Sequence, residues 1–256
     1  MSFEEKLAFG KAGAAADPRT TWHKRPSACA MSAAYERIGA GRIKSASETA
    51  ESRKRVRGFW YHCEPVRGTL AARYLTGRGL SWLARHEHLR FRAETPHPSG
   101  LGLRLPAMVA LVFDGQGAIC AVHRTYLDPS GAKASIEPNK ASLGSFVGGA
   151  IRLDPAAPEM VVGEGLETAA SASAMLGLPA WSAIACGNLR SAMVLPEMVR
   201  SVVIAADHDG PGRQAAAGAA RRWRAEGRTV RIFQPDTPKL DFNDLYRTRM
   251  EAIHAG

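Results

Sequence analysis

The sequence predicts an α/β fold with a parallel sheet flanked by helices in residues 151–256, preceded by a smaller, basic α+β unit in residues 59–150. Beyond residue 151, short apolar runs alternate with helical segments, which is the order typical of a parallel sheet. Before that point, two β-rich runs meet at the turn-forming segment 114–117, which predicts a hairpin. Residues 1–58 contain few large apolar side chains, so we expect a basic, flexible arm with short helices.

The elements of the second unit follow from local patterns. Pro211 stands near the start of one helical segment and Gly227 stands just past its end, as expected for helix boundaries. The expected strands are 160–162, 180–185, 201–206 and 229–233, and the expected helices are 166–176 and 211–226.

In the first unit, residues 69–78 have helical spacing, with Leu70, Tyr74 and Leu75 on one side. The glycines around Arg78 end this segment. Two strands, 108–113 and 118–126, are expected from their Val, Ile and aromatic content.

Composition limits the class of protein. The longest apolar runs are interrupted well before the roughly 20 residues that a membrane-spanning helix needs. The four cysteines form no CxxC pair, which favours reduced thiols and a cytoplasmic location over disulfides or a zinc knuckle.

The net charge of +10 is unevenly distributed along the chain. The first 150 residues hold 22 Lys and Arg against 12 Asp and Glu, whereas the remainder holds 12 of each. This pattern fits a surface that binds a polyanion beside an acidic catalytic centre. A purely solubilising surface accounts for the charge equally well.

Acidic residues follow three of the predicted strands. Ligands of open parallel sheets collect beyond the carboxyl ends of the strands. Carboxylates gathered there need a cation between them or must take up protons, and oxygen ligands without nearby His or Cys favour Mg²⁺ or Mn²⁺. The candidate metal ligands are Glu164, Asp207, Asp209, Asp241 and Asp244.

Other interpretations of these motifs are weaker. The segment Gly163-Glu164-Gly165 lacks the third glycine of a dinucleotide fingerprint, and its acid would repel a pyrophosphate. A calcium loop opening at Asp207 would have Pro211 and Gly218 at ligand positions. Asp207 and Asp209 could instead cap the next helix, but one cap needs only one of them, which favours a metal site for the pair.

Three segments resemble the motifs of Toprim domains, the fold shared by bacterial replicative primases, topoisomerases, OLD-type nucleases and RecR-type recombination proteins. They are residues 161–168, 203–209 and 241–245, in the same order and with similar spacing. The resemblance implies that Glu164, Asp207 and Asp209 are catalytic and that these residues share metal ions with Asp241 and Asp244.

The resemblance extends upstream to the catalytic core of bacterial DnaG-type primases. Residues 74–80 are similar to the YLxxRGL stretch of that core, and residues 121–125 and 138–140 resemble its basic segment. The resemblance implies a primase-like nucleotidyltransferase that acts on single-stranded DNA and nucleoside triphosphates. The phosphates would contact Arg124, Lys133 and Lys140, with Arg78 as a weaker candidate.

The chain departs from this pattern in three ways. Thr168 stands where primases usually carry a second acid, and Glu167 is one position early. No amino-terminal zinc module and no helicase motor are recognisable. We therefore expect one component of a phage, plasmid or mobile-element replication system, with a separate helicase or replication subunit as a candidate partner. The alternatives are a metal-dependent Toprim nuclease or nicking enzyme and a non-catalytic DNA-binding module.

Overall fold

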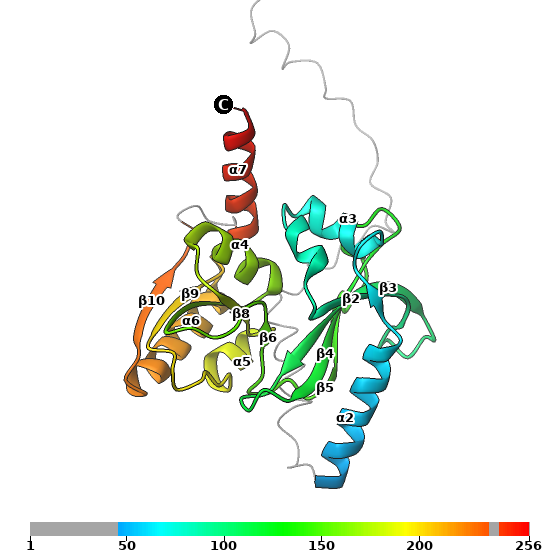
Figure 1. The fold of residues 1–256 in the computed structure, drawn as a ribbon, viewed down its shortest axis with the longest axis horizontal. Helices are drawn as coiled ribbons and strands as arrows, with labels where there is room; N and C mark the ends of the chain where they lie inside the picture. The colour runs from blue at the N-terminus through cyan, green and yellow to red at the C-terminus, as the bar shows by residue number, and fades with distance from the viewer. Residues whose placement is uncertain (1–45, 236–240, 256) are drawn as a thin grey trace, which may run out of the picture.

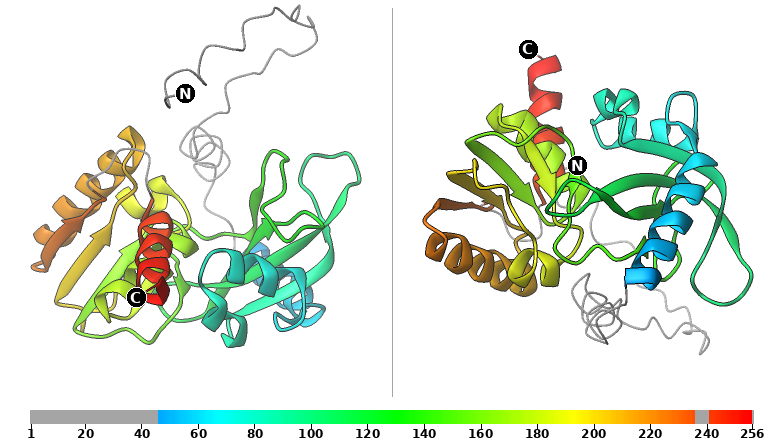
Figure 2. Two further views of the ribbon diagram at one scale, coloured as in Figure 1. Left: turned by 90° about the horizontal axis from the view of Figure 1, so that it is seen from above. Right: turned by 60° about the horizontal axis from the view of Figure 1, so that its bottom comes forward.

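Two five-stranded sheets form the framework of the protein (Figure 1). The computed structural model describes residues 46–235 and 241–255, so residues 1–45 of the predicted arm lie outside the described residues. Figure 2 shows from two further directions that the sheets lie side by side. An isolated bridge between Phe113 and Ala150 joins the first sheet to the segment that enters the second.

The first sheet is antiparallel and has the strand order β1-β2-β3-β4-β5. Its strands are β1 (Glu64–Pro65), β2 (Leu89–Pro96), β3 (Arg104–Phe113), β4 (Ile119–Tyr126) and β5 (Lys140–Gly144). Helix α2 (Ala46–Tyr61) contacts β4 and β5. Helix α3 (Leu70–Gly77) and the 3-10 helix η2 (Ser81–Arg85) contact β2.

Alternation along β3 explains how both faces of this sheet are covered. Val109 and Leu111 belong to the apolar cluster that includes Val56 of α2, whereas Met108 and Ala110 belong to the cluster that includes α3. Successive strand side chains point to opposite faces, so the two helices cover opposite sides of the sheet.

The second sheet has the order β10-β9-β7-β8-β6 and is parallel except for its edge strand β6. Its strands are β6 (Ile151–Arg152), β7 (Glu159–Gly163), β8 (Ala180–Ser182), β9 (Ser201–Ala205) and β10 (Thr229–Phe233). The accompanying helices are α4 (Leu166–Leu176), α5 (Cys186–Ser191), α6 (Gly210–Ala225) and α7 (Phe242–Ala255).

The strands at the centre of this sheet are buried on both faces. Val203 packs in the cluster that contains residues of α4, whereas Val202 and Ile204 pack in the cluster that contains residues of α5 and α6. This two-sided burial is why the segment 201–206 reads as a continuous apolar run rather than an alternating one.

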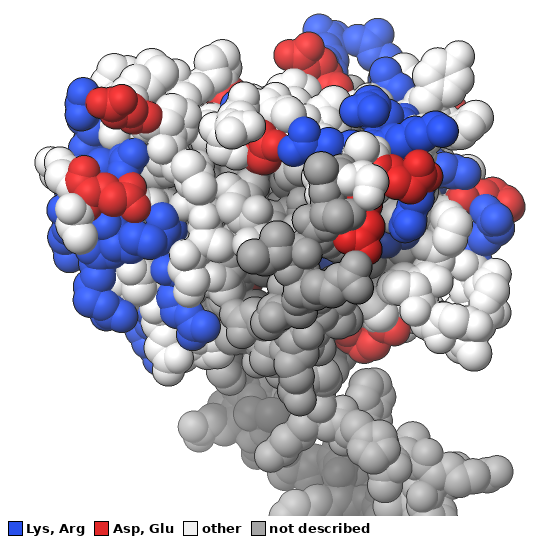
Figure 3. Space-filling model, turned by 90° about the horizontal axis from the view of Figure 1, so that it is seen from below, with Lys and Arg blue, Asp and Glu red and all other residues white. Residues whose placement is uncertain are grey.

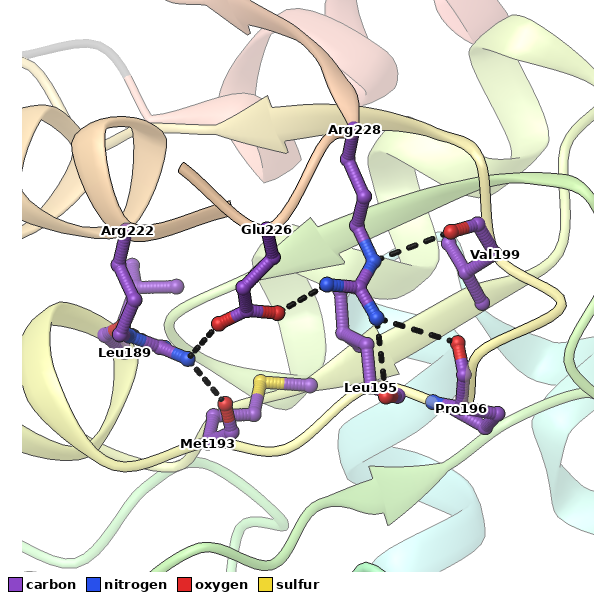
Figure 4. A network of polar contacts seen from close by, with 8 residues as sticks. All are labelled: Leu189, Met193, Leu195, Pro196, Val199, Arg222, Glu226 and Arg228. Carbon is purple, nitrogen blue, oxygen red and sulfur yellow. Dashed lines mark hydrogen bonds and ion pairs between the residues drawn. The ribbon is translucent and has the colours of Figure 1, made fainter. Parts of the chain in front are cut away.

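The loop between α5 and β9 is fastened by the carboxyl-terminal end of α6 (Figure 4). Arg222 donates to the carbonyl of Met193 at 2.9 Å, and Arg228 donates to the carbonyl of Val199 at 3.0 Å. Glu226 bridges the two guanidinium groups. These two arginines are therefore engaged in holding the fold.

The α/β architecture predicted from the sequence is confirmed, with a helix-flanked sheet that is mainly parallel. The predicted strand 180–185 ends early, because the chain turns at Ile184, whose φ is 75°, and enters α5. Residues 46–58, expected in a flexible arm, lie in α2, which crosses the predicted boundary at residue 58. In the described part of the chain, none of the helices has the length and apolar character needed to span a bilayer.

Candidate active site between the two sheets

A cavity of about 300 Å³ lies between the two sheets. Its walls come from both sheets, because residues of β4 and β5 meet the turns that follow β7, β8 and β9. The polar residues that line it are Arg78, His123, Lys133, Asn139, Lys140, Ser142, Glu164, Glu167, Thr168, Asp207 and Asp241. Its volume lies at the low end of the range for small-molecule sites.

Glu164 enters the cavity from the turn after β7. Its backbone carbonyl accepts a hydrogen bond from the amide of Ile184 at 2.7 Å, which ties this turn to the turn after β8. The thiol of Cys186 donates to the Glu164 carboxylate at 2.8 Å. Burial raises the pKa of Glu164, and the nearby Asp209 charge adds to this rise, although the thiol hydrogen bond opposes it.

Asp207 follows β9 and lines the same cavity. Burial, together with the charges of Glu164 and Asp241, raises the pKa of Asp207 to about 7. The hydroxyl of Thr168 donates to its carboxylate at 3.3 Å. The structure thus brings Glu164 and Asp207, which are 43 positions apart in the sequence, close enough for their charges to repel.

The remaining predicted acids have capping roles. Asp209 accepts a hydrogen bond from the amide of Gly212 at 2.6 Å and caps α6, as the capping interpretation expects for one member of the pair. Asp241 lines the cavity and accepts from the amide of Asp244 at 2.8 Å at the start of α7. The carboxylate of Asp244 turns back toward the amide of Asp241 at 3.5 Å and does not line the cavity.

Glu167, which stands one position earlier than the second acid of primases and was not among the predicted metal ligands, has two side-chain partners in the site. The Tyr74 hydroxyl donates to it at 2.6 Å, and the Lys140 ammonium lies 3.1 Å from its other oxygen. Burial alone would raise the pKa of Glu167, but Lys140, Lys133 and the tyrosine hydroxyl hold it well below its usual value. Tyr74 and Lys140 belong to the first unit, so this network joins the two units.

Three of the predicted basic residues line the cavity opposite the carboxylates: Arg78, Lys133 and Lys140. Arg78 exchanges hydrogen bonds with Asn243 of α7. The charge of Lys140 and burial lower the pKa of Lys133 to about 8. These cations place positive charge beside the buried acids.

Arg124 lies elsewhere. Its guanidinium donates to the carbonyls of Pro96, Ala141 and Ser142 and lies over the ring of Phe59. Neighbouring strand residues point to opposite faces, so it is His123 that faces the cavity while Arg124 faces α2. The structure gives Arg124 a role in fastening strands rather than in contacting a ligand in the cavity.

The second unit has equal numbers of basic and acidic residues, but these are not evenly distributed over its surface (Figure 3). Several acids of the second unit line the cavity, while the 16-residue helix α6 carries Arg213, Arg221, Arg222 and Arg224 and no acid. On the face drawn in Figure 3, Lys and Arg side chains accordingly gather on the side of the second sheet as well.

The chemical type of the acidic side chains in the cavity is suited to binding a divalent cation. Carboxylate oxygens are the ligands that Mg²⁺ and Mn²⁺ prefer. Burial raises the pKa of Asp207, and the charges of Glu164 and Asp241 add to this rise, as expected where several carboxylates meet. Within residues 46–235 and 241–255, however, no three His, Cys, Asp or Glu side chains converge on one point as a finished metal site.

Comparison with known proteins identifies the two units. Residues 159–252 match the family model of the Toprim domain, and residues 50–153 match a domain of unknown function (DUF7146). No curated protein matches the chain.

Solved structures of primases share the fold. A DNA primase domain from Pseudomonas aeruginosa is 17% identical, with a TM-score of 0.53 over 80% of this chain and 77% of that one. The DnaG catalytic core is 16% identical, with a TM-score of 0.54 over 80% and 78%. The RNA polymerase domain of Mycobacterium tuberculosis primase DnaG is 15% identical, with a TM-score of 0.50 over 82% of each chain. The chain therefore carries a Toprim domain within the fold of primase catalytic cores.

Sequence reasoning missed His123 and Ser142 as cavity residues, and it missed Cys186 as the thiol that donates to Glu164. Strand alternation offered a signal for His123, because it lies in the predicted strand 118–126 and points to the opposite face from Arg124. Ser142 had no such signal, because β5 was not predicted from the sequence. Cys186 carries no such signal, because its position depends on the turn at Ile184.

Proposed function

We propose that this Toprim-domain chain is a metal-dependent, primase-like nucleotidyltransferase that joins nucleotides on single-stranded DNA. The observation that carries the proposal is the two-sided cavity, in which Glu164, Asp207 and Asp241 stand opposite Lys133 and Lys140. Nucleotide transfer needs both kinds of charge, because cations align the phosphates while carboxylates hold the metal ions.

The residues of the cavity have distinct proposed roles. Glu164 and Asp207 would bind the cation. The carboxylates of Asp241 and Asp209 would become further ligands after their side chains turn toward it. When bound, a divalent cation supplies positive charge that aligns phosphates and favours ionisation of an attacking hydroxyl. Lys133 would contact phosphate directly, since it makes no ion pair within 4.0 Å in the described part of the chain. Lys140 would do so while paired with Glu167.

The test is labelled-nucleotide incorporation on single-stranded DNA with Mg²⁺ or Mn²⁺, run beside a supercoiled plasmid. Asp207→Asn keeps the size of the side chain and removes its charge, so we expect incorporation to fall by roughly 100-fold or more. The matched control is Glu197→Gln, which changes an exposed acid outside the cavity and should leave the rate unchanged.

The outcomes separate the three functions considered. Product made only with metal and lost in Asp207→Asn supports the proposal. Cleavage of the plasmid without incorporation would support a Toprim nuclease instead. Retention of DNA that is insensitive to a chelator, with neither reaction, would indicate a binding module. A separate helicase partner and a role in a mobile-element replication system remain predictions.

A further inference from the structure

A neutral polar pair lies in the same cavity and takes no part in the roles above. His123 of β4 and Ser142 of β5 are directly opposite each other in the antiparallel register. The imidazole Nδ1 lies 3.0 Å from the serine hydroxyl. Both residues line the cavity.

The imidazole is poorly suited to bind phosphate as a cation. Burial and the charge of Lys140 lower the pKa of His123 to about 3, so the ring is uncharged at neutral pH. Nδ1 is occupied by Ser142, while Nε2 makes no hydrogen bond to any described residue. One ring nitrogen thus remains for a ligand.

The pair lies beside the proposed phosphate contacts. Lys140 and Ser142 are two positions apart on β5, so their side chains point to the same face. At the usual strand rise their Cα atoms are about 6.6 Å apart. This is comparable with the separation between the 5′ phosphate and the sugar hydroxyls of a nucleotide. A nucleotide with its phosphate near Lys140 would bring its sugar near His123.

We propose that His123 and Ser142 recognise a ribose hydroxyl of the bound nucleotide and so select ribonucleotides over deoxyribonucleotides. This inference rests on the proposed function and adds substrate selection to it. If Nδ1 donates to Ser142, Nε2 accepts from the ligand; in the other tautomer Nε2 donates. A sugar hydroxyl can satisfy either arrangement, because it both donates and accepts.

The test measures the affinity of the full chain for ATP, 2′-deoxy-ATP and 3′-deoxy-ATP by calorimetry in the presence of Mg²⁺. A lost neutral hydrogen bond costs about 0.5 to 1.5 kcal/mol, or roughly 2- to 10-fold in affinity. We expect the wild-type chain to bind ATP more tightly than 2′-deoxy-ATP by that factor, whereas weaker binding of 3′-deoxy-ATP alone would overturn the inference. His123→Ala and Ser142→Ala should each bring the ratio close to one, and His123→Gln should restore part of it.

His62→Ala is the matched control, because His62 is exposed and lies outside the cavity. It should retain the wild-type ratio. The ratio, rather than affinity alone, is the decisive readout, since a purely structural defect weakens all three nucleotides equally. Equal wild-type affinities, or an unchanged ratio in His123→Ala, would overturn the inference while leaving the proposed function intact. Absence of any nucleotide binding by the wild-type chain would refute the proposed function itself.

Discussion

Replacing Tyr74 by Phe tests whether the hydroxyl that joins the two units stabilises the fold. The substitution removes one oxygen from a side chain that is only 3% exposed, and it creates no large cavity. The hydrogen bond that is lost is 2.6 Å long and is accepted by the carboxylate of Glu167. Glu167 is only 8% exposed, and its carboxylate is ionised because its pKa lies well below the usual value. Hydrogen bonds to charged groups are worth about 1.5 to 3 kcal/mol.

We therefore expect Tyr74→Phe to lower the free energy of unfolding by about 1.5 to 3 kcal/mol, measured by urea denaturation. In a chain of this size the melting temperature should fall by roughly 3 to 12 °C. Tyr61→Phe is the control, because Tyr61 is 81% exposed, and its effect should stay within about 0.5 kcal/mol.

A double-mutant cycle with Glu167→Gln locates the effect. If Tyr74 acts through the Glu167 carboxylate, the second substitution should cost less once the first is present. A stability of Tyr74→Phe equal to that of Tyr61→Phe would show that this hydrogen bond contributes nothing to the fold, and the reasoning would be wrong.

Three further predictions concern the cap of α6, two glycines and the pKa of Lys133. Asp209→Ala should cost about 0.5 to 2 kcal/mol by removing the cap of α6, whereas Asp209→Asn, which also caps well, should keep the stability in urea denaturation. Gly163→Ala should cost about 1 to 3 kcal/mol in the same assay, because the added carbon would lie 2.7 Å from the Ala169 amide nitrogen; Gly58→Ala, with open space around it, should stabilise α2 by up to about 1 kcal/mol. The pKa of Lys133 is about 8 in the folded protein, compared with 10.5 for an ordinary lysine. Between these two pH values the unfolded chain binds more protons than the folded one, so the free energy of unfolding rises with pH across that window. Lys133→Met should flatten that rise, and an unchanged slope in urea titrations from pH 8 to 10.5 would contradict the assignment.

Local signals explain which elements could be predicted from the sequence. The helix at 166–176 and the strand at 229–233 have the same bounds in the structure, since their apolar patterns and the terminal Gly177 mark both ends. Strands β5 and β6 were not predicted, because β5 has only five residues and β6 only two, which is too short for a clear apolar pattern. These strands form because they pair with β4 and β8.

The amino-acid sequence by itself determined the alternation of strands and helices beyond residue 151 and the position of Glu164 and Asp207 at the ends of strands. Those features depend on residues that are close together in the sequence, so local patterns are enough to predict them. Only the tertiary structure decided that Arg124 faces α2 while Lys140 meets Glu167. Such contacts join segments far apart in the chain, and their geometry is set by how the two sheets pack and not by any local pattern.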